Sequence, residues 1–143
     1  ASAIPGGWHR SGDVGHIDDS GRLWIGGRLV HVIHAPHGTV TPVGIEHAVE
    51  SIPGIEMAAA VGVGPRGTQQ VVVVAVPVGE ISRPRLADLE MADRVRSTTD
   101  VDVAAVLLVS ALPVDKRHNS KIDRTQVAEW AERVLAGGRM ARL

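Results

Sequence analysis

The most restrictive feature of this 143-residue chain is the apolar run from Val71 to Val76, in which no polar residue interrupts five valines and one alanine. Branching at Cβ favours an extended backbone, and a strand without polar positions has no side that suits water. Such a strand has to be covered on both faces. The run therefore predicts a strand over residues 70–78, in a sheet that is packed by helices.

Weaker patterns place the other elements. Apolar runs predict two further strands, over 55–63 and 101–109, and turn residues between short apolar runs predict a hairpin or meander within 15–33. Residues 34–41 have the composition of a loop. Helical spacing of apolar residues predicts three helices, over 41–51, 84–96 and 123–135. We therefore expect an α+β fold: a small three-stranded sheet packed by helices, with an N-terminal β-hairpin.

The predicted helices have recognisable ends and buried faces. Thr41 is expected to cap the first helix, because its hydroxyl can accept from exposed N–H groups. Residues 139–143 should fray, since Gly137-Gly138 ends the last helix. We expect the second and third helices to bury the following side chains: Leu86, Leu89 and Val95, then Val127, Trp130, Ala131 and Val134.

Composition excludes several classes of function. Fifteen basic against sixteen acidic residues give a net charge of -1, which argues against a dedicated nucleic-acid partner or an anionic membrane surface. The absence of cysteine excludes disulfides, thiolate metal sites and a cysteine nucleophile. No apolar run approaches the ~18–20 residues of a transmembrane segment, and the first residues lack the pattern of a secretion signal. We therefore expect a soluble, cytoplasmic protein.

Three patterns suggest chemistry but have simpler interpretations. Gly62–Gly67 matches G-x-G-x-x-G, but a strand rather than a helix comes next, so we interpret it as a hairpin turn. His31, His34 and His37 stand three apart on an extended segment, where they point to different sides, so we expect no metal site. Asp18-Asp19, before Ser-Gly, is typical of a turn whose side chains bond their own backbone.

A fourth set of segments is informative through its order and spacing. These segments are Trp8–Asp13, Gly21–Arg28, Gly38 with Pro42–Glu46, and Leu112–Arg124. Together they resemble the carboxyl-terminal domain of the adenylate-forming superfamily, which includes acyl-CoA synthetases, luciferases and the adenylation domains of peptide synthetases. The resemblance covers nearly the whole chain. It implies a nucleotide-binding pair, a hinge and a catalytic lysine at particular positions of this sequence.

The first implied roles concern the nucleotide. In the family, an aromatic-Arg-Thr-Gly-Asp segment closes the large amino-terminal domain, and its aspartate holds the ribose hydroxyls of ATP. Asp13 takes that place here, with Ser11 in place of threonine. The chemistry agrees, because an ionised carboxylate can accept from two vicinal hydroxyls at once. Gly27-Arg28 matches the Gly-Arg motif that opens the mobile domain, so Arg28 is implied to hold the ribose or phosphate region.

Further implied positions relate to movement and to the second half-reaction. Two residues beyond the arginine the family has its hinge, usually Asp or Lys, and this chain has Val30. Gly38 corresponds to the glycine beside the pantetheine tunnel, where coenzyme A would enter. Val30 is therefore the implied hinge, and Gly38 is implied to serve the second half-reaction.

The last motif of the family reads Pro-x-x-x-x-Gly-Lys and ends in a catalytic lysine. Here Asn119-Ser120-Lys121 replaces the glycine by serine, and Lys121 takes the lysine position. Lys116, Arg117 and His118 are nearby, but none stands at that position. The Arg-His-Asn-Ser-Lys-Ile form of the loop is most similar to the β-lactone synthetases of long-chain olefin biosynthesis. These activate a β-hydroxy fatty acid with ATP and close the adenylate onto its own hydroxyl. A fatty acyl-CoA synthetase is the alternative.

The resemblance also divides the chain. Residues 1–27 correspond to the end of the large amino-terminal domain with linker strands, and residues 28–143 to the mobile carboxyl-terminal domain. Nothing here matches the family's phosphate loop or acyl pocket, which belong to the amino-terminal domain. We therefore expect that absent domain to be the partner that mainly holds ATP and Mg²⁺. The other expected partners are a fatty acyl substrate and, for a thioester product, CoA.

On this interpretation the chain is a fragment of an AMP-forming ligase, and the isolated domain is expected to be inactive. The alternative is a free-standing, non-catalytic binding or interaction module with the same fold. An upstream reading frame that encodes a phosphate loop would favour the ligase. The acyl chain length, the choice between a thioester and a β-lactone product, and the oligomeric state stay open.

Overall fold

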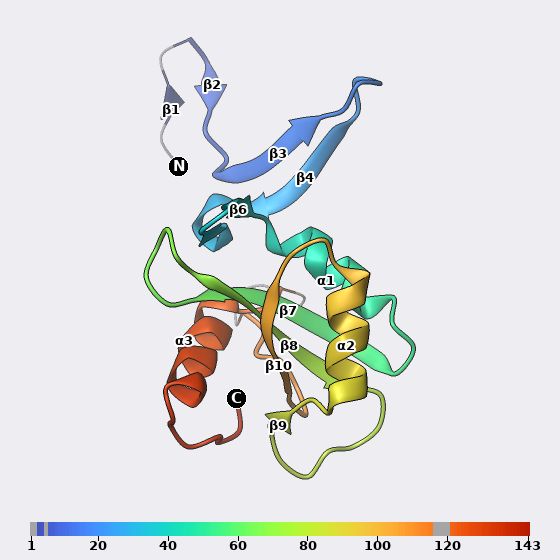
Figure 1. Ribbon diagram of the computed structural model, residues 1–143. Coiled ribbons are helices and arrows are strands. Elements are labelled where there is room, and N and C mark those ends of the chain that lie inside the picture. The colour runs from blue at the N-terminus through green and yellow to red at the C-terminus, as the bar shows by residue number, and fades with distance from the viewer. Residues whose placement is uncertain (1–2, 5, 116–120) are drawn as a thin grey trace.

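The computed structural model describes residues 3–4, 6–115 and 121–143, and its centre is a four-stranded mixed sheet in the order β7-β8-β10-β9 (Figure 1). Strand β8 pairs antiparallel with β7 and parallel with β10, and β9 pairs antiparallel with β10. The strands are β7 (Ile55–Val63), β8 (Gln70–Pro77), β9 (Arg85–Leu86) and β10 (Val103–Leu108). The α+β class is as predicted, and the two-residue β9 adds an edge strand to the three expected.

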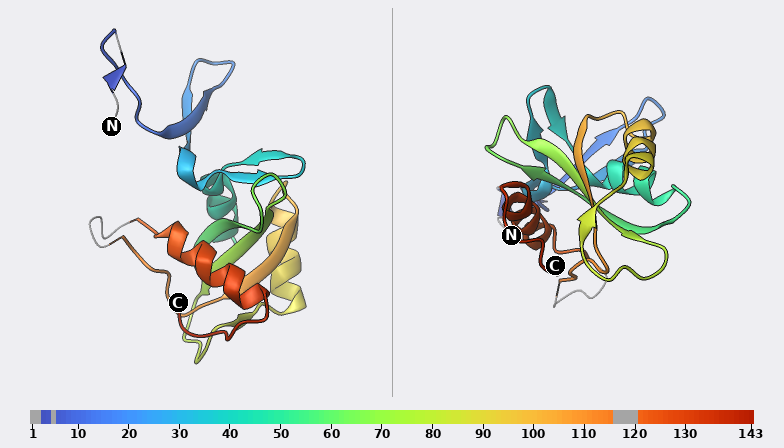
Figure 2. Two further views of the ribbon diagram at one scale, coloured as in Figure 1. Left: turned by 90° about the vertical axis from the view of Figure 1, so that its left-hand side faces the viewer. Right: turned by 60° about the horizontal axis from the view of Figure 1, so that its bottom comes forward.

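Helices cover both faces of this sheet, as the valine run predicts. The left view of Figure 2 shows α1 (Pro42–Glu50) and α2 (Leu89–Thr98) on one side and α3 (Arg124–Leu135) on the other. Alternate side chains of β8 divide between the two cores, because successive residues of a strand point to opposite faces. Val71, Val73 and Ala75 pack under α1 and α2, whereas Val72, Val74 and Val76 pack under α3.

Three small antiparallel ladders precede the sheet in the described part of the chain. They are β1 (Ala3–Ile4) with β2 (Trp8–His9), β3 (Asp13–Ile17) with β4 (Leu23–Arg28), and β5 (Ile33–Ala35) with β6 (Gly38–Val40). The β3–β4 ladder confirms the predicted hairpin, and Figure 1 shows β1 to β4 extending away from the sheet. The expected loop over 34–41 is instead the β5–β6 hairpin, because Ile33 pairs with Val40 around a turn at Pro36.

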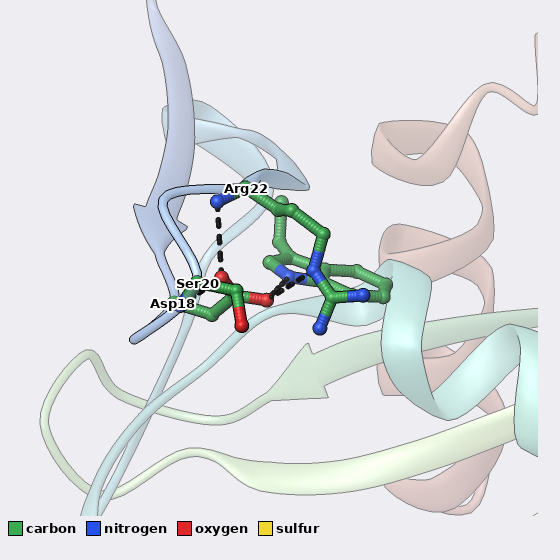
Figure 3. A network of polar contacts seen from close by, with 4 residues as sticks. Asp18, Ser20 and Arg22 are labelled. Carbon is green, nitrogen blue, oxygen red and sulfur yellow. Dashed lines mark hydrogen bonds and ion pairs between the residues drawn. The ribbon is translucent and has the colours of Figure 1, made fainter.

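The turn of the β3–β4 hairpin is held by the carboxylate of Asp18, as expected of a turn former. It accepts from the backbone N–H groups of Ser20 at 2.9 Å and Arg22 at 3.0 Å, and from Arg22 Nε at 2.8 Å (Figure 3). Trp24 Nε1 donates to the same carboxylate at 2.8 Å. The Trp24 hydrogen bond first, and then the Arg22 backbone, lower the pKa of Asp18 to about 2. The turn is therefore closed by an ionised carboxylate over the neutral pH range.

The prediction for the second helix is wrong at its start. Asp88 caps α2 by accepting from Met91 N at 2.9 Å, so the helix begins at Leu89 and not near Pro84. Leu86 lies in β9, and both Leu86 and Leu89 are exposed, whereas Val95 is buried as expected. None of the helices formed by residues 3–4, 6–115 and 121–143 is long and apolar enough to cross a membrane.

Other local predictions have mixed outcomes. The Gly62–Gly67 segment is the antiparallel connection from β7 to β8, as predicted. Within the described chain, Thr41 makes no side-chain cap on α1. Its side chain lies against Gly26 of β4, where an added Cβ would come within 2.9 Å of Thr41 Cγ2, so this close approach requires glycine.

The carboxyl-terminal segment does not fray as expected. The Ala141 carbonyl accepts from Trp130 Nε1 at 2.9 Å, and Met140 and Leu143 pack against the core under α3. The α3 stripe itself is as predicted: Val127, Trp130, Ala131 and Val134 are all buried. The tail therefore completes the α3 side of the core.

Leu107 tests the importance of this second core, because its side chain is fully buried beneath α3. Leu107→Ala should lower the free energy of unfolding by about 2–5 kcal/mol, through lost apolar burial and a residual cavity. Urea denaturation measures the change. The matched control is Leu89→Ala, since Leu89 is 81% exposed, and it should shift stability by less than about 0.5 kcal/mol. Equal effects of both variants would contradict the assignment of the core.

Candidate functional site

The candidate site begins where strands β3 and β4 meet the body of the domain. Asp13 and Arg28 are partners in the antiparallel register, and Arg28 Nη1 donates to Asp13 Oδ1 at 3.0 Å. Leu29 N donates to Gly12 O at 2.8 Å, which continues the pairing beyond β4. Both charged side chains stay accessible, with 36% of the Asp13 and 57% of the Arg28 side chain exposed. Each can therefore reach a ligand without leaving its strand.

The charges around Asp13 link it to a third predicted residue. A hydrogen bond with the Ser11 hydroxyl, and then one with Arg28, lower the pKa of the Asp13 carboxyl below its ordinary value. The positive charge of Lys121 lowers it further. Lys121 itself is exposed. The charge of Lys121 thus acts on Asp13, although the two residues lie far apart in the sequence.

Lys121 stands at the closed end of a loop. Asp115 N donates to Lys121 O at 2.7 Å, Asp123 N donates to Pro113 O at 2.9 Å, and Val114 bridges Ile122. Asn119 and Ser120 of the predicted motif lie outside the described residues, as do Lys116, Arg117 and His118. The backbone of Lys121 is therefore fixed by an antiparallel bridge directly before α3.

Helix α3 is tied to α1 by a buried ion pair. Arg124 Nε donates to Glu46 Oε1 at 2.8 Å, and Arg124 Nη2 donates to Glu46 Oε2 at 2.5 Å, a two-bond geometry. Only 6% of the Glu46 and 20% of the Arg124 side chain is exposed. The hydrogen bond to Glu46 raises the pKa of Arg124 above its ordinary value. A charged pair therefore joins the two helices in a region that excludes most water.

Helix α1 is in turn attached to the edge strand of the sheet. Glu46 Oε1 also accepts from Ala60 N at 3.0 Å, and Glu50 Oε1 accepts from Ala58 N at 3.0 Å. Because Glu46 and Glu50 lie one helical turn apart, they meet alternate N–H groups of β7. Glu46 therefore connects three elements: α1, β7 and α3.

The implied hinge comes directly after the Asp13–Arg28 pair. Val30 lies in the 3-10 turn η1 (Leu29–His31) and is 82% exposed. Val30 and His31 border a pocket of about 280 Å³, together with Arg124. Burial, and then the charge of Arg124, lower the pKa of His31. The segment after the hinge position and the start of α3 therefore border the same pocket.

Gly38 belongs to a different place in the fold. It begins β6 with a φ of 133° and borders a pocket of about 540 Å³, together with Asp100 and Asp102. The residues described as lining that pocket include none of Asp13, Arg28 and Lys121. Of the predicted site residues, Asp13 and Arg28 form an ion pair, and the charge of Lys121 acts on Asp13. Val30 follows Arg28 closely in the sequence, and Gly38 borders a separate pocket.

The donor set at Asp13, Arg28 and Lys121 suits a nucleotide. A carboxylate accepts from sugar hydroxyls, and a guanidinium and an ammonium donate to phosphate oxygens. Within the described ranges, no group of three His, Cys, Asp or Glu side chains could hold a metal ion.

The Glu46–Arg124 pair was not predicted as part of the site, although both residues stand in the segments that carry the resemblance. A signal was present, because Glu46 lies in the apolar face of α1 between Ile45 and Val49. A carboxylate on a buried face needs a partner. The identity of that partner is a long-range property, since 78 residues separate the two.

Comparisons with known proteins give relatives of one kind. No family model matches the chain. The olefin β-lactone synthetase of Stenotrophomonas maltophilia is 35% identical over 128 residues, which are 89% of this chain and 23% of that protein. A long-chain-fatty-acid–CoA ligase of Mycobacterium tuberculosis is 32% identical over 88 residues, 60% of this chain and 18% of that protein. The chain thus spans about a quarter or less of the length of these curated relatives.

Solved structures have the same fold. The amide bond synthetase McbA from Marinactinospora thermotolerans matches with a TM-score of 0.72 and 26% identity, over 90% of this chain and 26% of that chain. ATP-bound MatB from Rhodopseudomonas palustris matches with a TM-score of 0.71 and 20% identity, over 92% of this chain and 26% of that chain. Both matches again cover about a quarter of the longer protein.

The electrostatics of the site can be tested by titration. Ser11→Ala and Arg28→Met should each raise the pKa of Asp13 towards its ordinary value, because the Ser11 hydrogen bond, and then the hydrogen bond and charge of Arg28, lower it. NMR of the Asp13 carboxyl carbon against pH measures both. The pKa of Asp13 is lower in the folded state than in the unfolded state, so the Asp13–Arg28 pair stabilises the β3–β4 hairpin fully at pH values above the unfolded-state pKa. This stabilisation is lost as the pH falls through the folded-state pKa of Asp13. Arg22→Met is the control and should leave Asp13 unchanged.

Proposed function

Because the chain belongs to the carboxyl-terminal domains of the adenylate-forming superfamily, we propose that it is the mobile lid of an ATP-dependent fatty-acid-activating ligase. The enzyme joins a carboxylate to the α-phosphate of ATP and releases pyrophosphate. A thiol or the substrate's own hydroxyl then attacks the acyl carbon of the acyl-adenylate, which releases AMP and forms a thioester or a β-lactone. The observation that carries the proposal is the 35% identity of the chain to an olefin β-lactone synthetase over 89% of its length. The ion pair of Asp13 with Arg28, two residues from separate motifs, supports it.

The domain boundary lies at the end of β4. Residues 1–27 are the end of a large amino-terminal domain with its linker strands, and residues 28–143 are the lid. Exposed apolar side chains on the β3–β4 hairpin support this division: Ile17, Leu23, Trp24 and Ile25 are each more than half exposed. An apolar surface of this kind suits burial against another domain. The greater length of the relatives supports the same interpretation.

Asp13 and Arg28 bind the nucleotide. The low pKa of Asp13 keeps its carboxylate ionised at neutral pH, so that it accepts from both ribose hydroxyls. Arg28 holds Asp13 in place before ATP binds and contributes positive charge to the ribose and phosphate region. ATP and Mg²⁺ are held mainly by the amino-terminal domain, which also supplies the acyl pocket.

Lys121 is the catalytic residue of the lid. An oxygen of the fatty carboxylate attacks the α-phosphorus, the bond to pyrophosphate breaks, and negative charge gathers on the α-phosphate oxygens. An ammonium on a long stem contacts both the attacking carboxylate and those oxygens, and stabilises the charge as it develops. The exposed position of Lys121 supports this role, because an exposed side chain can enter an active site formed with another domain.

After adenylation the lid rotates about Val30 and removes Lys121 from the site. Exposure of Val30 and the glycines that precede it support a hinge at this position. Rotation brings Gly38 to the second half-reaction. The higher coverage of the β-lactone synthetase relative favours a β-hydroxy fatty acid as substrate, and the acyl-CoA ligase relative keeps CoA as the alternative acceptor.

In the full-length enzyme, Lys121→Ala should slow acyl-adenylate formation by a factor on the order of 10²–10³, as for loss of one preorganised electrostatic partner. Consumption of a preformed adenylate should change much less. ATP–pyrophosphate exchange measures the first step, and rapid-quench turnover of isolated acyl-adenylate measures the second. Near-normal exchange by this variant would exclude Lys121 as the catalytic lysine.

The isolated chain is the reference for that experiment. It should show no ATP–pyrophosphate exchange, because adenylation requires both substrates to be held in line. If the pure domain shows exchange, and Lys121→Ala abolishes it, the proposal that the amino-terminal domain holds the substrates would be overturned.

Val30→Pro tests the hinge, since proline fixes φ and restricts the preceding residue. In the full-length enzyme it should impair one half-reaction far more than the other. Val30→Ala is the control and should leave both rates near normal, because the exposed Val30 side chain packs little. Equal loss in both half-reactions, or no loss in either, would place the hinge elsewhere.

A further inference from the structure

We infer that Glu46 and Arg124 are positioning residues, which hold Lys121 in a single place on the lid for adenylation. The inference rests on the proposed function of Lys121. It starts from the closeness of Arg124 to Lys121 along the chain. Arg124 is the first residue of α3 and comes three positions after Lys121. Whatever fixes the side chain of Arg124 therefore fixes the end of the segment that carries the lysine.

The segment that carries Lys121 is held from several sides. Its described backbone hydrogen bonds join residues 113–115 to residues 121–123, and Leu112 and Ile122 pack into the apolar core beneath α3. Asp123 caps α3 by accepting from Gln126 N at 3.1 Å. The Arg124 side chain adds a polar link from this unit to α1.

The Glu46 carboxylate, which accepts the hydrogen bonds of Arg124, is itself held in place. Glu46 is buried, and its Oε1 accepts from Ala60 N while both its oxygens accept from Arg124. The two parallel bonds define an angle as well as a distance, which a single bond does not. Since the pair is largely withdrawn from water, a broken geometry leaves a buried charge without a partner, and alternative positions of Arg124 are disfavoured.

The pair lies wholly within the lid. Glu46, Ala60 and Arg124 all come after Val30, so they rotate together and their contacts are the same in both orientations of the domain. Loss of the pair should therefore leave both orientations of the lid accessible. It should make only the position of Lys121 within the lid less well defined. A loss confined to the step that uses Lys121 distinguishes positioning from general support of the fold.

The experiment uses two conservative variants in the full-length enzyme. Arg124→Lys keeps the charge but loses the two-bond geometry, and Glu46→Gln keeps an acceptor for Ala60 N but loses the charge. Each should slow ATP–pyrophosphate exchange by about 10- to 100-fold, because small misplacements of a catalytic group have effects of that size. Turnover of preformed acyl-adenylate should stay within about twofold of wild type.

The chain offers a matched control in Glu50→Gln. Glu50 lies one turn along α1 and bonds the same edge strand through Ala58 N, but its described hydrogen bonds do not include Arg124. This variant should leave exchange near normal. Circular dichroism melts of all three variants show whether they are folded. A parallel fall of both half-reactions in Arg124→Lys and Glu46→Gln, or an equal loss in Glu50→Gln, would show a merely structural role and overturn the inference.

A second arm separates this inference from the proposed function. In a Lys121→Ala background, Arg124→Lys should slow exchange no further, because positioning has no effect once the positioned group is absent. Multiplicative loss in the double variant would overturn the inference. Slow exchange in Lys121→Ala together with normal exchange in Arg124→Lys would overturn the inference alone, whereas normal exchange in Lys121→Ala would overturn the proposed function.

Discussion

The arrangement of this domain depends on one buried ion pair, between Glu46 of α1 and Arg124 of α3. Removing two charges from water is unfavourable, and the interaction offsets this only because both guanidinium bonds form and a carboxylate oxygen also meets Ala60 N. The pair therefore specifies geometry more than it adds stability. It sets α3 against α1 at the edge of the sheet, next to the segment after η1 and directly after the loop that ends in Lys121.

The composition of the core explains how three helices fit around so small a sheet. Phenylalanine and tyrosine are absent, and β7 presents Ala58, Ala59 and Ala60, all fully buried. Small side chains on the strand let α1 and α3 approach the backbone closely, so that Glu46 can reach an N–H group of β7. In the core beneath α3, the large ring of Trp130 fills the space, and the carboxyl-terminal segment packs over it. The hydrogen bond from β7 to Glu46 therefore depends on the small alanine side chains of the same strand.

Sequence patterns predict those parts of the fold in which the local signal is complete. The valine run and the α3 stripe need no distant partner to be recognised, and both are as predicted. The start of α2 was missed because Pro84 and Asp88 are both plausible first-turn residues, and the pairing of Leu86 with Leu107 decides between them. The short β5–β6 hairpin was missed for a similar reason: each strand has only three residues, and Pro36 and Gly38 give the segment the composition of a loop. At the site, the resemblance predicts roles for Asp13, Arg28 and Lys121, and the folded chain adds that Asp13 and Arg28 form an ion pair. The contact between Glu46 and Arg124 depends on tertiary packing, which no local pattern contains.

The attachment of α1 to β7 has a consequence for the behaviour of the protein in a crowded solution. Strand β7 is an outer strand of the sheet, and an outer strand with free N–H groups can recruit a strand from another molecule. Here the outward N–H groups of Ala58 and Ala60 are already bonded to Glu50 and Glu46, and the helix that carries these carboxylates lies along the strand. An incoming strand would meet occupied donors and negative charge. The same acidic side chains that orient the helices thus protect this edge from intermolecular β-sheet growth.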